Sequence, residues 1–228
     1  MRMVLRVAAK ELRHALNSQV AYLLVGVFVI ATPIPIFWSS GASNIFLNGQ
    51  ASLTAFFGIL PLFLAVLVPA LAMQTWASER GSGTLELLMS FPLRERDLVL
   101  GKFLGTYLII LTCLLGTLLV PLLVAQLGDL DLGPVFGGYA GALLLAAACL
   151  AVCMFVGSFT RNHITAFILG LLALLILMSH NLPALNFHGR FVHIARGVLD
   201  SRDLSFYLVV TIGFLYLNIK RLELGRCA

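Results

Sequence analysis

The sequence predicts an all-α, polytopic membrane protein, and three observations support this prediction. Of the 228 residues, 60% are hydrophobic and only 11% are charged, whereas soluble domains are about 45–50% apolar and about 25% charged. Disordered chains combine low hydrophobicity with high net charge, which excludes that class. The apolar residues come in long unbroken blocks, unlike the alternating pattern of an outer-membrane barrel.

Six apolar blocks approach or exceed the roughly 20 residues that a helix needs to cross a bilayer. We expect six transmembrane helices at about 20–38, 53–74, 103–127, 137–159, 164–182 and 204–219. The blocks take up more than half of the chain and leave only short loops. Residues 1–228 are therefore predicted to form a single membrane domain.

Residues 1–18, ahead of the first block, predict a basic amphipathic helix in the headgroup region. Basic side chains recur every three or four residues, at Arg2, Arg6, Lys10 and Arg13. A second face is apolar and is made of Leu5, Ala8, Leu12 and Leu16. The alternative is a solvated helical extension whose periodicity is incidental.

The orientation follows from the basic residues, because Lys and Arg mark cytoplasmic loops. If the N-terminus is inside, twelve of the fifteen basic residues lie inside, and only Arg190, Arg196 and Arg202 lie outside. Both termini are therefore predicted to be cytoplasmic.

The five longer blocks contain no Asp, Glu, Lys or Arg, and intramembrane charges are what ion paths and proton relays require. The histidines near the outer loop, His180, His188 and His193, have irregular spacing, which favours interfacial side chains over a haem or metal site. The phosphate-binding pattern G-x-x-x-x-G-K-[ST] does not occur in the sequence. We expect no catalytic, metal or cofactor site, so any ATP that drives transport must bind to a separate protein.

The longest cytoplasmic stretch, residues 79–102, carries four basic and four acidic residues. Thr84 is placed to begin a short helix, with Glu86 in its first turn, where the helix dipole favours an anion. Leu85, Leu88 and Met89 give this helix an apolar edge, and the residue before Pro92 leaves the helical region. An apolar edge amid balanced charge is typical of a helix that docks into a groove on another protein; a solvated loop is the alternative.

Several stretches of this sequence resemble one family of membrane proteins. They are Pro69-Ala70-Leu71-Ala72-Met73, Glu79-Arg80, Gly83-Thr84-Leu85-Glu86-Leu87-Leu88, Phe91-Pro92, Leu98-Val99-Leu100-Gly101-Lys102, Ser158-Phe159-Thr160-Arg161-Asn162 and Gly197-Val198-Leu199-Asp200-Ser201-Arg202-Asp203-Leu204. Taken together they resemble an ABC-2 type transporter permease, and more narrowly the gliding-associated ABC permease group. The resemblance covers nearly the whole chain.

The resemblance implies the ABC-2 exporter fold and a coupling helix at Thr84–Ser90 that sits on a nucleotide-binding subunit. The residues it assigns to ATPase coupling are Glu79, Gly83, Thr84, Leu85, Glu86, Leu87, Leu88 and Pro92. It makes residues 1–18 an elbow helix beside the ATPase, and residues 183–203 a re-entrant outer segment. It also implies partners: two copies of an ABC ATPase that bind ATP and Mg, a second permease copy or paralogue, and a possible envelope subunit in a bacterial inner membrane.

The outer segment 183–203 is too apolar for a water-exposed loop, which supports the re-entrant interpretation. We expect helical pieces packed against the fifth and sixth spans, with Phe191 and Ile194 pointing inward. Arg196 and Asp200 are four residues apart and could pair across one helical turn.

A stripe of small residues runs along the fourth span and lets helices approach closely. It consists of Gly133, Gly137, Gly141, Cys149, Cys153 and Gly157. Packing within the chain and dimerisation explain this stripe equally well.

The sequence favours the membrane subunit of an ATP-driven exporter. A mechanotransmitter that passes ATP-driven motion to an envelope partner is the alternative, although the loops are too short for a large outer domain. An intramembrane enzyme would need convergent His, Asp or Ser residues, which the spans do not supply.

Overall fold

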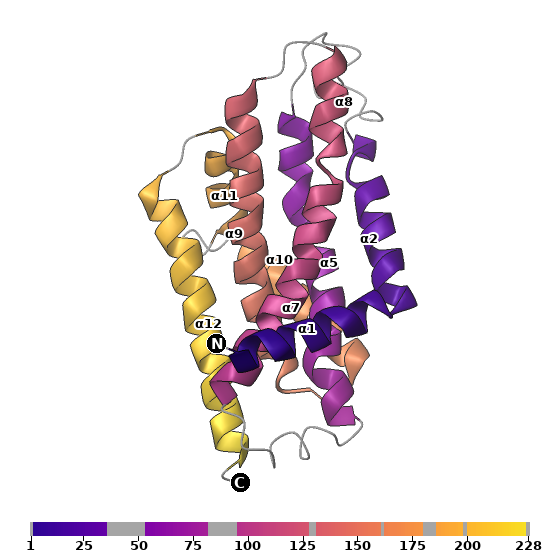
Figure 1. Ribbon diagram of the computed structural model, residues 1–228. Helices are drawn as coiled ribbons and strands as arrows, with labels where there is room; N and C mark the ends of the chain where they lie inside the picture. The colour runs from indigo at the N-terminus through magenta and orange to yellow at the C-terminus, as the bar shows by residue number, and fades with distance from the viewer. Residues whose placement is uncertain are drawn as a thin grey trace.

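The computed structural model describes residues 2–35, 53–81, 95–127, 131–160, 162–179, 186–197 and 200–226. Almost all of these residues are helical (Figure 1). In chain order the helices are α1 (Arg2–Leu16), α2 (Gln19–Ala31), α5 (Thr54–Gly81), α7 (Glu95–Gly116), α8 (Leu119–Leu127), α9 (Leu132–Gly157), α10 (His163–Met178), α11 (Phe187–Ala195) and α12 (Ser201–Arg226).

Four segments are long and apolar enough to cross a membrane: Thr54–Trp76, Glu95–Gln126, Leu132–Gly157 and Ser201–Leu224. They coincide with four of the six predicted spans. A fifth span is reached if α1 and α2 count as one, but these helices meet at a bend of 78°. The predicted blocks 20–38 and 164–182 both run beyond the described residues, and α10 has 16 residues. The count of six spans therefore stays a prediction.

Helix α9 is the centre of the bundle, since α5, α7, α10, α11 and α12 all contact it. Its side chains are small where its neighbours are bulky. The Cα of Gly138 faces the Phe57 ring of α5 so closely that a Cβ would clash with the ring. The apolar core follows the length of this helix, where Leu145, Cys149 and Leu150 are all fully buried.

The small-residue stripe on α9 is used, in part, within the chain. A Cβ on Gly137 would lie 2.5 Å from the Ile194 carbonyl oxygen, and a Cβ on Gly141 would lie 3.0 Å from the Ile194 Cγ2. Cys149 and Cys153 are buried as well. Packing against α11 thus explains the middle of the stripe, and these positions are not free for a second copy.

The two ends of the chain lie at the same end of the bundle (Figure 1). Helix α1 crosses the bundle there, close to where α12 finishes and α7 begins, while α8 lies at the opposite end. At this end Arg221 of α12 lies over the Phe159 ring, 4.9 Å from its centroid. Helix α1, the start of α7 and the end of α12, all of which carry basic residues, therefore lie near one another, and the sidedness predicted from charge stays a prediction.

Helices α5, α7 and α12 extend further than the apolar blocks that predicted them. Helix α5 continues to Gly81 and α7 begins at Glu95, so both ends of the predicted loop 79–102 are helical. Residues 82–94 lie outside the described residues. Hydropathy underestimates these helices because their terminal turns carry charged side chains.

Candidate functional site

Helix α1 packs tightly across the first turns of α7, and two glycines of α7 make this possible. A Cβ on Gly101 would lie 2.5 Å from the Val7 Cβ, and one on Gly105 would lie 2.6 Å from the Glu11 Cβ. Small residues in register allow the helix backbones to approach closely. The contact fixes α1 as part of the bundle rather than as a detached helix.

The packed face of α1 differs from the apolar face expected from its periodicity. Ala8 is buried, and Val7 packs against the hydrophobic core. Leu5 and Leu16 stay 63% and 52% exposed. The predicted apolar face is therefore divided: Ala8 belongs to the contact with α7, and the two leucines are free for lipid.

The predicted basic face of α1 is turned away from this contact. Arg6, Lys10 and Arg13 are exposed. For Arg2, the structure gives the place in α1 and no side-chain environment. Helix α1 thus has three faces, of which one contacts α7, one is apolar and exposed, and one is basic and exposed.

Lys102 is the most unexpected residue at this junction, because its side chain is only 1% exposed. Its ammonium donates to the Glu11 Oε1 of α1 at 2.9 Å and to the Thr75 carbonyl oxygen of α5 at 2.8 Å. It also lies over the Trp76 ring, 5.1 Å from the centroid, a distance suited to a cation–π interaction. One side chain of α7 therefore contacts both α1 and α5.

The sequence analysis placed Lys102 at the end of the cytoplasmic stretch 79–102 and did not foresee that its side chain is buried. The signal that could have corrected it is Glu11, an acidic residue on the same helical face as Val7, Ala8 and Ala15. A carboxylate in an apolar face is costly unless it is paired. It therefore indicates a buried cation on the helix that α1 contacts.

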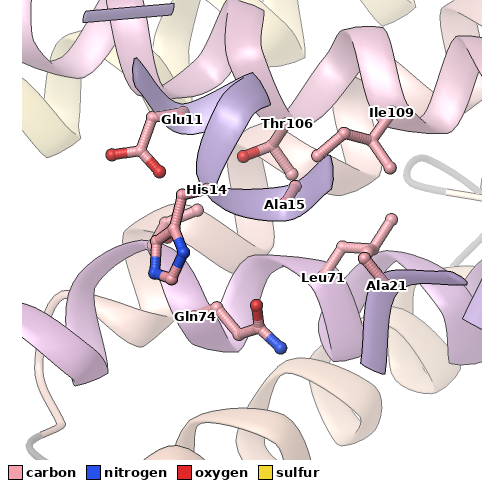
Figure 2. A pocket seen from close by; sticks show the side chains of 9 residues that line it. Glu11, His14, Ala15, Ala21, Leu71, Gln74, Thr106 and Ile109 are labelled. Carbon is pink, nitrogen blue, oxygen red and sulfur yellow. The ribbon is translucent and has the colours of Figure 1, made fainter. Parts of the chain in front are cut away.

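A small pocket opens beside this cluster, at the point where four helices meet (Figure 2). Its polar lining comes from α1, α5 and α7, and its apolar lining comes from α2 as well as from these three helices. The lining residues are Glu11, His14, Ala15, Ala21, Leu71, Gln74, Thr75, Thr106 and Ile109. Among the residues that the structure describes, no three His, Cys, Asp or Glu side chains gather as a metal ion would require.

The predicted coupling residues are for the most part beyond what the structure describes. Glu79 lies in the last turn of α5, and its side-chain environment is not described. Gly83, Thr84, Leu85, Glu86, Leu87, Leu88 and Pro92 all lie outside the described residues. Their role in docking stays a prediction.

The outer segment forms α11, a short helix capped by Asn186, whose side-chain oxygen accepts from the Gly189 N–H at 2.8 Å. Phe191 and Ile194 are fully buried, as the composition predicts, and so is Phe187. Their main partner is α9, the fourth predicted span, and α10 and α12 contribute less. The expected contacts with the fifth and sixth spans are present, and the structure adds a larger contact with α9, because the glycines of α9 offer the closest approach.

The ion pairs of the outer segment also differ from the expectation. Arg196 and Asp200 are both exposed and do not pair, because α11 ends at Ala195 and the Asp200 carboxylate accepts instead from the Arg202 N–H at 3.0 Å. The pair that forms is Arg190 with Asp203, at 2.8 Å between Nη1 and Oδ1.

This second pair ties α11 to the first turn of α12. The Arg190 guanidinium lies over the Phe206 ring, 4.2 Å from the centroid. The Tyr207 hydroxyl donates to the Phe187 carbonyl oxygen at 2.7 Å. The apolar composition of the outer segment predicted packing against the sixth span, but it did not predict these polar contacts.

Comparison with known proteins places this arrangement in a family. Residues 8–189 match the family model described as "ABC-2 family transporter protein". A search of curated proteins finds no match. The matched region begins within α1 and ends within α11. It therefore includes α2, α5 and α7, the helices that meet α1 around Lys102 and the pocket. The chain therefore belongs to the ABC-2 transporter family and is its multi-pass membrane permease domain, a component that performs no catalysis itself.

Proposed function

We propose that this chain is the permease subunit of an ATP-driven ABC-2 exporter, in which a separate ATPase subunit drives movement of a substrate across or out of the membrane. Two copies of that ATPase bind ATP and Mg, and a second permease copy or paralogue completes the pathway. The spans lack charged residues in their apolar blocks. A lipid-like, amphipathic or polymeric substrate suits such a surface better than a small ion does.

The observation that carries the proposal is the position of the helices that lead into and out of residues 82–94. The hydrogen bond from Lys102 to the Thr75 carbonyl oxygen brings the start of α7 beside the end of α5. Both lie near α1, at the end of the bundle opposite α8 (Figure 1). A force applied to the segment between them would therefore reach two candidate spans and α1 directly.

Two elements of the family pattern are assigned in the same proposal. Helix α1 serves as the elbow helix at the cytoplasmic surface, with its basic face toward lipid headgroups or the ATPase. Helix α11 serves as the re-entrant outer segment near the exit of the pathway. Its buried apolar face and its glycine-lined contact with α9 support this role, because irregular backbone at membrane depth needs protein around it.

Purification of the tagged full chain from its native membranes tests the proposal. Because the chain has no phosphate-binding loop, ATP hydrolysis has to come from a separate subunit. We therefore expect an ABC ATPase to co-purify and the complex to hydrolyse ATP. The same chain stripped of its partner is the matched control and should neither bind nor hydrolyse ATP. Nucleotide binding by the stripped chain, or a complex with no ATPase, would contradict the proposal.

A further inference from the structure

We infer that Lys102 is a positioning residue that ties α1 to both helices bordering residues 82–94. We call the group formed by Lys102, Glu11 and the Thr75 carbonyl the Lys102 link. Through it, α1 moves together with α5 and α7 when a force acts on the segment between them. The inference rests on the proposed function, because the moving force comes from the ATPase.

The first step of the argument is the burial of the charge. The Lys102 side chain is 1% exposed and its partner Glu11 is 15% exposed. Taking an ammonium out of water is costly unless geometry and hydrogen bonds compensate for the lost hydration. Here the compensation comes from two oxygens at 2.9 and 2.8 Å and from the Trp76 ring. A charge held in this way has one favourable position, whereas an apolar side chain can slide.

The second step is that the partners lie on different helices. Glu11 belongs to α1, Thr75 to α5, and Lys102 itself to α7. A second lysine ion pair among the described residues, Lys220 with Glu223, joins residues three apart on α12, and its side chains are 48% and 34% exposed. Lys102 with its partners thus links three helices, whereas Lys220 and Glu223 lie on a single helix.

The third step distinguishes positioning from stability. Replacing a buried ion pair by apolar residues is often neutral or stabilising, so such a pair is weak evidence for stability. The glycine contacts at Gly101 and Gly105 already hold α1 close to α7. What the ion pair adds is register: Glu11 can meet Lys102 at only one position of α1 along α7. Motion passes between elements that have discrete arrangements of this kind.

Spin-label distances in the complex with its ATPase test the inference. Two doubly labelled chains are made, and both carry the reference label at Leu132→Cys, at the far end of α9. The second label is on α1 at Ala9→Cys in one chain and on α7 at Leu104→Cys in the other. All three positions are exposed, and Cys227→Ala removes the cysteine that lies outside the described residues. The two distances are compared between the nucleotide-free and vanadate-trapped states.

In the otherwise unchanged chain we expect the α1 and α7 distances to shift together. In Lys102→Gln, the α7 shift should persist while the α1 shift falls to less than half. Glu11→Gln, whose site is partly exposed, should do the same and serves if Lys102→Gln does not fold. The exchange of charges, Glu11→Lys with Lys102→Glu, should restore the α1 shift, which a purely structural role would not produce. Lys220→Gln is the matched control and should change neither distance.

The inference is overturned if α1 and α7 still shift together in both Lys102→Gln and Glu11→Gln, by the same distances as in the parent. The absence of any α7 shift in the parent complex would instead count against the proposed function. In that event the distance from Ala9→Cys to Leu104→Cys in the nucleotide-free chain decides on the Lys102 link. A distribution that broadens in Lys102→Gln and narrows again in the charge exchange supports the link, and an unchanged distribution overturns it.

Discussion

Gly137 on α9 faces a backbone atom of α11, so this position has no room for a methyl group. A Cβ there would lie 2.5 Å from the Ile194 carbonyl oxygen, and backbone cannot turn aside as a flexible side chain can. We expect Gly137→Ala to destabilise the protein by about 1–3 kcal/mol, the usual cost of overpacking, as a lower Tm in detergent. Gly58→Ala on α5 is the matched control, because no heavy atom lies within 4 Å of a Cβ there. A Tm that is equal in both variants would show that α11 is not held at Gly137.

Leu88 is the residue on which the proposed docking helix depends most. Truncation of a buried leucine costs about 2–5 kcal/mol, so Leu88→Ala should reduce the amount of ATPase that co-purifies, and Leu88→Asp should reduce it further. Glu86→Ala should have a smaller effect, because a charge at an exposed helix start contributes about 0.3–1 kcal/mol. The chain should keep its Tm in all three variants. Equal ATPase recovery from Leu88→Asp and from the parent would place the docking site elsewhere.

For single residues, the sequence predicts the burial of a side chain where that burial follows from hydropathy. Phe191 and Ile194 are inward because an outer segment rich in aromatic and branched residues cannot stay in water. Lys102 could not be placed in this way, because its burial depends on Glu11, which is 91 residues away in the chain. Pairing between distant helices leaves no trace in local composition.

Helix α11 gives the sharpest test among the elements, since its two faces differ. Single cysteines at Phe187, Phe191 and Ile194 should be protected from a water-soluble thiol reagent, because these side chains are fully buried. Cysteines at His193 and Arg196 should react quickly, because both positions are exposed. The measurement is the labelling rate in intact membranes. Uniformly fast labelling along 186–197 would mean that the segment is an ordinary solvated loop.

The sequence predicts where helices occur better than where they end. Apolar blocks mark α5, α7, α9 and α12, because a helix that faces lipid or a core must be apolar around its circumference. The ends of α7 and α12 carry charged turns, at Glu95 and near Arg226, and hydropathy stops short of both. The sharp turn between α1 and α2 is marked only by Asn17 and Ser18, which favour turns but do not set an angle.

For the whole molecule, the orientation in the membrane follows from charge and can be measured directly. Reporter fusions after residues 48, 131 and 190 should read as outside, and those after 90 and 162 as inside. The physical reason is that twelve of the fifteen Lys and Arg residues lie in the segments predicted to be inside. An outside signal at residue 90 would place the coupling segment away from ATP and end the exporter account.

The assembly could not be predicted from the sequence in the same way. Apolar side chains on α2, α10 and α12 remain exposed, among them Ile30, Ile164 and Val209. Lipid tails and a second permease copy are equally apolar, so hydropathy does not separate a lipid-facing surface from an interface between copies. The structure does assign glycines with no space for a Cβ, such as Gly137 and Gly141, to contacts within one chain.

The central claim is that a separate ATPase drives this chain through residues 84–90. Crosslinking from Leu88→Cys in native membranes, with a short thiol-reactive crosslinker, tests it most directly. Leu132→Cys, at the opposite end of the bundle, is the matched control. The account predicts an adduct between the chain and an ABC ATPase from Leu88→Cys and none from Leu132→Cys. Transport that persists with no adduct from Leu88→Cys, or an adduct of equal yield from Leu132→Cys, would contradict it.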